Sequence, residues 1–452
     1  MKKENTMLSG NALKNIILFA LPIMLSSLLQ YNYSLVDNII VGRYVSTDAL
    51  AAVGNVGSIN GFIIGAAFGL TSGFTIPVAH SFGAGDSRKV AHYSGSSIVV
   101  SAILGTVIVL FGHIFSKPLL SAIGTPDEII DLSASYLNIL YFGVPFQMLS
   151  NNFTAISRAV GESKKPLYFF IISVFVNFVL DLLFVKQFGW GVEGAAAATL
   201  VSHIVAAVLT GIYVLKFNKN ILLTKKDLKL DLSTAWYQIK LGIPVSLQFT
   251  ITSVGSMCLQ SAVNSFGKNV MAGFTAAGRV ENLTNIPMSG LGVATQTFVG
   301  QNYGAKNYER ITKSVQQIFL LDLLVSVAMS ITLYYIGTPM VSLFMTQQNV
   351  EMMHAAQRYI LATAQCYSLV AVLFVLRNTL QGLGFTYSNM IAGAGEFFGR
   401  LAIAFVLTPA LGFDAVCYAA PAAWLLADIP LAVIYLSKHK KFKALANIQK
   451  KL

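Results

Sequence analysis

The sequence VNFVLDLLFV, residues 176–185, places one amide, Asn177, and one carboxylate, Asp181, among eight apolar side chains. It belongs to an apolar run that extends over residues 165–187. A helix needs roughly 20 apolar residues to cross the hydrocarbon of a bilayer, so this run predicts a membrane-spanning helix. Because no water is present there to satisfy the backbone, a helix is the only plausible structure for such a segment. The amide and the acid would then lie inside the membrane.

Similar apolar runs recur along all 452 residues, which are 55% hydrophobic and 11% charged. A soluble domain of this size carries roughly 25% charged residues. We therefore expect an all-α polytopic membrane protein with about twelve membrane-spanning helices. The expected spans cover residues 14–40, 51–78, 91–116, 129–157, 165–187, 191–216, 236–264, 270–298, 311–337, 352–378, 385–410 and 413–437.

The net charge of +12 is unevenly distributed between the two ends of these spans. With the N-terminus taken as cytoplasmic, 24 Lys and Arg side chains fall on the inner side and five on the outer side, and Arg279 and Arg400 lie within spans. This bias follows the positive-inside rule and predicts that both termini are cytoplasmic, in a cell membrane. The charge therefore sets orientation and implies no nucleic-acid partner. The first apolar run is followed by a charged loop, so we expect no cleaved signal peptide.

The two halves of the chain repeat each other. Pro22, in FALPIMLSSLLQ (19–30), corresponds to Pro244, in LGIPVSLQFTIT (241–252). Further pairs follow at nearly the same shift in residue number, namely Gly83 with Gly304, RAVG (158–161) with TLQG (379–382), and WGVEGA (190–195) with LGFDAV (411–416). This register predicts two six-helix halves in parallel orientation, with a substrate path near the middle of the membrane. Because channels also use repeats, the repeat alone does not separate a pore from a carrier.

The repeat and the hydrophilic segment KFNKNILLTKKDLKLDLSTA define the expected domains. These are an N-lobe with helices one to six (1–215), a cytoplasmic linker (216–235), a C-lobe with helices seven to twelve (236–437) and a basic cytoplasmic tail (438–452).

Ionisable side chains inside the first half are the strongest functional signal. A charged residue at the bilayer centre costs about 2.5–3.5 kcal/mol on insertion scales and usually marks an ion pathway or a binding site. Asp181 has Asn177 one turn before it, and Asp37, in the first span, has Tyr33 one turn before it. Other polar residues within the spans of this half are Asn151, Asn152 and Thr199. Such oxygen-rich groups suit a hard monovalent cation, or a proton shared between carboxylates.

The repeat provides an internal comparison for this polar set. In the alignment above, Asp37 corresponds to Leu259, Asn177 to Phe398, Asp181 to Ala402 and Thr199 to Ala420. The second half thus lacks every member of the set. This favours an ion-coupling function over a structural hydrogen-bond network, which stays the alternative interpretation.

The doubled halves, the early prolines and the segment RVENLTNIPMSGLGVATQTFVGQNYGAKNYERI (279–311) resemble the multidrug and toxic-compound extrusion (MATE) family of transporters, in particular its DinF-type prokaryotic branch. The resemblance covers nearly the whole chain. It implies a V-shaped fold of two six-helix lobes that functions as a monomer. It also implies export of amphipathic, often cationic, drugs or toxic organic compounds in exchange for H⁺ or Na⁺, with no further cofactor.

The same resemblance implies a cation site in the N-lobe. Its residues would be Asp37, Asn151, Asn177, Asp181 and Thr199, with support from Tyr33, from Asn152 and from Pro22, where the first helix bends. Another branch of the family carries acids in spans seven and ten. Here span seven offers Gln248, and span ten has no acid between Ala355 and Leu376, which argues against a cation site in the C-lobe.

Other charged residues within the spans have simpler interpretations. Glu396 and Arg400 lie four residues apart and are expected to form an intrahelical pair. Asp322 and Asp428 each stand alone on a span, where they could bind a cationic cargo.

Two other functional classes fit the sequence less well. A flippase for a lipid-linked precursor would need several basic residues for the cargo phosphates, whereas the spans offer chiefly Arg279 and Arg400. An intramembrane enzyme would need a motif such as HExxH, but the six histidines are scattered. The three cysteines, Cys258, Cys366 and Cys417, lie within apolar runs, where packing is their expected role.

Overall fold

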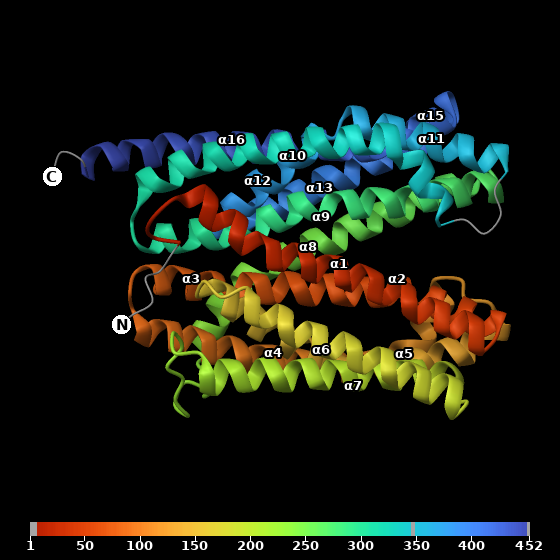
Figure 1. Ribbon diagram of the computed structural model, residues 1–452, viewed down its shortest axis with the longest axis horizontal. Helices are drawn as coiled ribbons and strands as arrows, with labels where there is room; N and C mark the ends of the chain where they lie inside the picture. The colour runs from red at the N-terminus through yellow and green to blue at the C-terminus, as the bar shows by residue number, and fades with distance from the viewer. Residues whose placement is uncertain (1–6, 345–348, 450–452) are drawn as a thin grey trace. The chain divides into compact units, whose positions relative to one another are not determined.

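The computed structural model describes residues 7–344 and 349–449, and all regular structure in these ranges is helical (Figure 1). The chain forms two compact units. The first comprises the described parts of Met1–Met24 and Leu247–Leu452, and the second comprises Leu25–Ser246. The all-α fold expected from the sequence is confirmed.

Two helices contribute to both units, namely α1 (Ala12–Tyr44) and α8 (Leu232–Asn264). The other helices of the second unit are α2 (Thr47–Phe74), α3 (Ile76–Gly83), α4 (Ser87–Ala122), α5 (Asp127–Ala159), α6 (Lys164–Asp181) and α7 (Gly191–Ile212). The other helices of the first unit are α9 (Lys268–Gly304), α10 (Tyr308–Ser342), α11 (Val350–Gln365), α12 (Ser368–Gly382), α13 (Tyr387–Ala402), α14 (Thr408–Leu411), α15 (Phe413–Cys417) and α16 (Ala419–Gln449).

Ten of the described helical segments are long and apolar enough to cross a membrane. An eleventh span results if α11 and α12, which meet at 58°, are taken together. The remaining expected span, 270–298, is formed by the 37-residue α9, whose apolar sequence is interrupted by polar side chains. All twelve expected segments are therefore helical. The helix α16 continues to Gln449, so the described part of the basic tail extends the last span.

Three of the described helices end in a turn of π-helix. These are α6, continued by η1 (Leu182–Gln187), α7, continued by η2 (Tyr213–Phe217), and α13, continued by η3 (Ile403–Leu407). In η1 the amide of Phe188 donates to the carbonyl of Leu183, five residues back, at 2.9 Å. Such turns are rare and often occur at functional sites. The turn in η1 begins directly after Asp181.

In the second unit, the first turns of α8 pack tightly against α2. A Cβ atom on Gly73 would lie 2.4 Å from Cα of Gly242, so the two backbones touch. The buried Gln238 donates from Nε2 to the carbonyl oxygens of Phe74 (3.0 Å) and Tyr93 (2.8 Å). These contacts place the beginning of α8 in the core of the second unit.

The hydrophilic linker between the halves is ordered by an ion pair in the second unit. Arg88 Nη1 lies 2.8 Å from Oδ1 of Asp227, whose side chain is fully buried. Burial alone would raise the pKa of Asp227, but hydrogen bonds from Thr224 and the charge of Arg88 outweigh it and lower the pKa. The Asp227 carboxylate therefore stays charged at neutral pH and fixes the linker to the start of α4.

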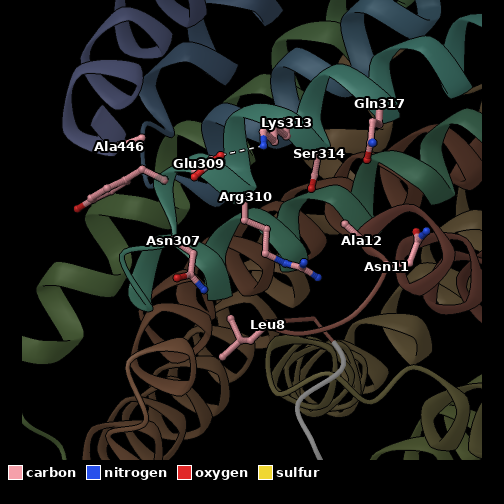
Figure 2. A pocket seen from close by; sticks show the side chains of 11 residues that line it. Leu8, Asn11, Ala12, Asn307, Glu309, Arg310, Lys313, Ser314, Gln317 and Ala446 are labelled. Atoms are coloured by element: carbon pink, nitrogen blue, oxygen red, sulfur yellow. Dashed lines mark ion pairs between the residues drawn. The ribbon is translucent and has the colours of Figure 1, made fainter. Parts of the chain in front are cut away.

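In the first unit, the residues before α1 are fixed to the start of α10. Arg310 donates to the carbonyl oxygens of Met7 (3.4 Å), Ser9 (3.0 Å) and Gly10 (2.9 Å). A cavity of about 640 Å³ lies beside this contact and is lined by Asn11, Asn307 and Lys313, among others. Figure 2 shows the Arg310 side chain between the N-terminal segment and α10. The cavity contains none of the site residues expected from the sequence.

The offset in residue number between equivalent positions of the two halves changes in the later part of each half. Gly161 (φ 86°) and Gly384 (φ 87°) both adopt the left-handed backbone that glycine tolerates after a helix. The amide of Gly161 donates to Arg158, and the amide of Gly384 donates to Gln381 in the same way. The structural counterpart of Gly161 is therefore Gly384. Because the alignment of RAVG with TLQG pairs Gly161 with Gly382 instead, that alignment is wrong by two residues.

This shift corrects three of the counterparts assigned above, including that of Thr199, which corresponds to Ala422 rather than to Ala420. With Gly161 aligned to Gly384, Asn177 corresponds to Arg400 rather than to Phe398, and Asp181 corresponds to Ala404 rather than to Ala402. The exposure of the side chains agrees with the corrected alignment, because Asn177 is buried whereas Phe398 is 61% exposed. The second half still has no acid at the counterpart of Asp181, but it carries a charged side chain at the counterpart of the amide.

Candidate cation-coupling site

Three helices of the second unit bring five of the expected site residues together. The helix α1 provides Tyr33 and Asp37, α6 provides Asn177 and Asp181, and α7 provides Thr199. Spacing of four residues on α1 and on α6 places each polar pair on one face of its helix. Asn177 and Asp181 are at most 1% exposed, and Thr199 is also buried.

The amide of Asn177 links the two carboxylates. Oriented by its hydrogen bonds, its nitrogen donates to Oδ1 of Asp37 (3.2 Å) and to Oδ2 of Asp181 (3.1 Å). Its oxygen accepts a hydrogen bond from the Tyr33 hydroxyl at 3.2 Å. The Tyr33 hydroxyl oxygen in turn accepts a hydrogen bond from the Thr199 hydroxyl, with the two oxygens 3.2 Å apart. One continuous polar chain therefore connects α1, α6 and α7.

The two carboxyl groups are themselves within hydrogen-bonding reach of each other. Two ionised carboxylates at this separation repel each other strongly, so the pair is stable only with a proton or a cation between them. The second oxygen of Asp181, Oδ1, is buried and has no hydrogen-bond partner among the described residues. The donor set consists of hard oxygen atoms, which fit H⁺ or Na⁺.

Two contributors to this site were missed in the sequence. Ser202, one turn after Thr199 on α7, forms a hydrogen bond with Tyr33. Tyr136, a buried residue of α5, lies close enough to Asp37 and Asp181 to interact with their charges. The spacing of Ser202 from Thr199 could have indicated it, whereas nothing in the sequence marks Tyr136 among 18 tyrosines.

Asn151 and Asn152 of α5 have different environments. Asn152 is fully buried and faces α4, where its Nδ2 donates to Ser97 O and to Ser101 Oγ, both at 2.6 Å. Its Oδ1 accepts a hydrogen bond from the Ser97 hydroxyl at 3.1 Å. Asn151 is partly exposed, and no hydrogen bond joins it to the carboxylates in the described part of the chain. In the described structure, neither asparagine is therefore hydrogen-bonded directly to Asp37 or Asp181.

Pro22 lies within α1, on the N-terminal side of Asp37, and the two units divide two residues after it. Pro244 lies within α8, and there too the division follows two residues later. A proline inside a helix removes one backbone hydrogen bond and favours a kink at that point. Both prolines therefore stand where their helices pass from one unit to the other.

In the first unit, Glu396 pairs with two arginines. Its carboxylate lies 3.5 Å from Arg400, as the sequence predicts, and it forms a shorter ion pair with Arg377 of α12. The 24 inner-side charges counted from the sequence include Arg377, which lies near the end of the expected span 352–378. Because its side chain is only 11% exposed and pairs within the helices, it does not belong to that count.

Comparison with known proteins agrees with this architecture. The family model MatE matches residues 22–183 and 244–406, two segments of nearly equal length that begin at the paired prolines. The chain is 28% identical over 406 residues to the probable multidrug resistance protein YoeA of Bacillus subtilis (strain 168), covering 87% of each chain. It is 23% identical over 378 residues to the multidrug export protein MepA of Staphylococcus aureus (strain MSSA476), covering 83% of this chain and 84% of that one.

A solved structure of a multidrug resistance MATE family transporter in an outward-facing conformation has the same fold. The TM-score is 0.89 at 24% identity, and the match covers 99% of both chains. The family model matches well over half of the sequence in two repeated segments, in agreement with the internal repeat. The chain therefore belongs to the MatE family, the multidrug and toxic-compound extrusion transporters, and it is a multi-pass membrane transporter of small molecules rather than an enzyme.

Proposed function

We propose that the protein is a secondary antiporter that exports amphipathic, often cationic, organic compounds in exchange for H⁺ or Na⁺ bound at Asp37 and Asp181. The names of the relatives YoeA and MepA support export of drugs as the cargo class. The distribution of Lys and Arg supports a cell-membrane orientation with both termini in the cytoplasm.

One observation carries the coupling proposal. Two acids from different membrane-spanning helices share a buried site with an amide that bonds to both. A purely structural network would be satisfied by neutral side chains, because a charge inside the membrane costs about 2.5–3.5 kcal/mol. The counterparts Leu259 and Ala404 show that the six-helix architecture itself does not require the acids.

The amide of Asn177 suits both states of such a site. Without a cation, its nitrogen donates to both carboxylates, as described above. Rotation of the amide by half a turn would direct its oxygen toward the same two groups. Three oxygen-bearing side chains would then surround a cation, with the buried Oδ1 of Asp181 as a further ligand. Binding of one H⁺ or Na⁺ relieves the repulsion between the two carboxylates and changes the contact between α1 and α6.

The driving force depends on the charge of the cargo. Moving one charge through about 150 mV is worth roughly 3.5 kcal/mol. Exchange of one monovalent ion for one monovalent cationic compound is electroneutral, so it would be driven by the chemical gradient of the ion alone. Exchange of two ions, or export of a neutral compound, would also use the membrane potential.

Transport in proteoliposomes under separate H⁺ and Na⁺ gradients tests the proposal. We expect one gradient, or both, to drive export of a fluorescent cation such as ethidium. Asp37→Asn and Asp181→Asn should each reduce driven transport by at least about tenfold, since loss of a group that binds the coupling ion removes most of its binding free energy. Asp131→Asn is the matched control, because Asp131 is 81% exposed and pairs with Lys117 on the surface.

The proposal is wrong if ethidium moves equally well without either gradient, or if both Asp37→Asn and Asp181→Asn transport like the unmodified protein. Insertion and monodispersity of each variant are measured in parallel, so that a folding defect is recognised as such.

A further inference from the structure

The first unit contains a second buried group of charges, formed by Arg377, Glu396, Arg400 and Asp428. The helix α12 provides the first, α13 the next two and α16 the last. Close packing of α13 and α16 brings them together, because a Cβ atom on Gly395 would lie 2.6 Å from the carbonyl oxygen of Leu426. Glu396 and Asp428 thus lie on helices whose backbones are in contact.

Three of these charges form a connected set. Glu396 is 3% exposed and accepts from both Arg377 and Arg400, whose side chains are 11% and 12% exposed. Two cations face one anion within this set, and Glu281 of α9 lies close enough to Arg400 to interact with its charge. Asp428 lies close enough to Arg377 and Glu396 to interact with both charges.

Asp428 forms no hydrogen bond with the nearby Arg377. The residue is 5% exposed, and neither of its oxygens has a hydrogen-bond partner among the described residues. Nε of Arg377 is also buried and has no partner there. An ionised carboxylate without a partner is very costly in such a place, whereas a protonated carboxyl is much less so. The arrangement therefore fits a protonated Asp428, with an unused Arg377 donor ready for the ionised form.

We propose that Asp428 is a proton-binding site of the first unit, and that loss of its proton recruits Arg377 from its pairing with Glu396. The site is separate from Asp37 and Asp181, and the proposal holds whichever ion binds there. The repeat adds support, because Arg400 occupies the counterpart of Asn177, so both units place polar groups at this position of the fold.

Other ionisable groups near α16 have partners or lie apart from this group. Asp414 of α15 pairs with Arg358 of α11. Glu281 of α9 accepts a hydrogen bond from Tyr359 at 2.6 Å. Asp322 of α10 is fully buried without a hydrogen-bond partner in the described chain, so it is the most useful comparison for Asp428.

The structure contains a natural reporter of this proton. Trp424 lies one turn before Asp428 on α16, is 5% exposed and packs edge-on against Tyr367, with ring centres 6.1 Å apart. Only two other tryptophans occur in the chain, Trp190 and Trp236, and both are exposed. The Trp190→Phe, Trp236→Phe protein therefore reports on the surroundings of Asp428 through a single fluorophore.

The experiment is a fluorescence titration of this single-tryptophan protein in nanodiscs, between about pH 5 and pH 9, the range that buried carboxyl groups reach. We expect a sigmoidal change in emission that is absent in Asp428→Asn and retained in Asp322→Asn. Glu396→Gln should move the transition to lower pH, because it removes a negative neighbour and releases Arg377 to pair with the carboxylate.

A flat titration of the single-tryptophan protein would overturn the proposal, as would a transition that persists unchanged in Asp428→Asn. If Asp428→Asn does not fold, an unshifted transition in Glu396→Gln would overturn it equally well. The readout requires no transport, so its outcome is independent of ion coupling at Asp37 and Asp181.

Discussion

Two neighbouring asparagines on α5, Asn151 and Asn152, differ in the contacts of their side chains. Asn152 makes three short contacts with Ser97 and Ser101 of α4, whereas Asn151 has no such contacts in the described structure. Removing one partner of a buried hydrogen bond costs about 1–3 kcal/mol. Asn152→Ala should therefore lower the thermal unfolding temperature of the purified protein, and Asn151→Ala should leave it nearly unchanged.

Transport by the two variants, measured per folded molecule, separates this structural role from ion binding. We expect Asn152→Ala to retain the ion dependence of the unmodified protein. Equal thermal stability of the two variants would show that the contacts between α4 and α5 do not depend on Asn152.

At the scale of residues, the sequence predicts charges better than neutral groups. Asp37 and Asp181 were recognisable because a carboxylate inside an apolar run has few structural explanations. Tyr136 was not recognisable, because a tyrosine in a membrane-spanning helix usually packs or lies at the interface. Asp428 was noticed as a lone acid, but its relation to Arg377 depends on the packing of α12, α13 and α16, which no local pattern encodes.

At the scale of helices, contact between α2 and α8 depends on the absence of a side chain at Gly73. A Cβ atom there would lie within 2.7 Å of three backbone atoms of residues 241 and 242, which cannot move aside like a flexible side chain. Gly73→Ala should therefore destabilise the second unit or prevent its folding. Overpacking of this kind typically costs about 1–3 kcal/mol.

The same helix offers a matched control. A Cβ atom on Gly61 would meet no atom within 4 Å. Because alanine favours a helix over glycine by about 1 kcal/mol, Gly61→Ala should be neutral or slightly stabilising. Thermal unfolding followed by size-exclusion chromatography in detergent compares the two variants. A Gly73→Ala protein as stable as Gly61→Ala would show that α2 and α8 separate more easily than their contact suggests.

Helix positions followed from the sequence because the length and polarity of each apolar run are local properties. Interruptions within the helices did not follow. The break between α11 and α12 falls at Cys366 and Tyr367, where neither glycine nor proline signals it. The π-helical turn after Asp181 lies in an uninterrupted apolar sequence. The two-residue change in repeat register became visible only through the turns at Gly161 and Gly384.

At the scale of the whole molecule, each compact unit contains the beginning of a helix from the other half of the sequence. The sequence repeat divides the chain at the hydrophilic linker, because the repeat is defined by the similarity between the two halves. The two compact units instead divide the chain within α1 and α8, after Pro22 and Pro244, because these units are defined by contacts between residues. Contacts between residues far apart in the chain cannot be derived from a single sequence, which is why the exchange of segments was not predicted.

This exchange has a consequence for fragments of the chain. A fragment of residues 1–230 ends before α8 and therefore lacks Gln238, which bonds to Phe74 and Tyr93, and Gly242, which packs on α2. A fragment of residues 1–264 includes all of α8 and with it every residue of the second unit. We expect the longer fragment to accumulate in membranes and to resist trypsin, and the shorter one to be degraded, because its core at Phe74 would be open.

Co-expression of residues 1–230 with residues 231–452 should restore a protease-resistant protein, since each fragment supplies what the other lacks. The second fragment needs the first as well, because Ile16, Phe19 and Ile23 of α1 form a core with Leu291 and Phe298 of α9. Equal protease resistance of fragments 1–230 and 1–264 would contradict this argument, because it would show that the first half folds without the beginning of α8. Unequal resistance would show that the exchanged segments are needed for the folding of each unit and do more than connect the two halves of the chain.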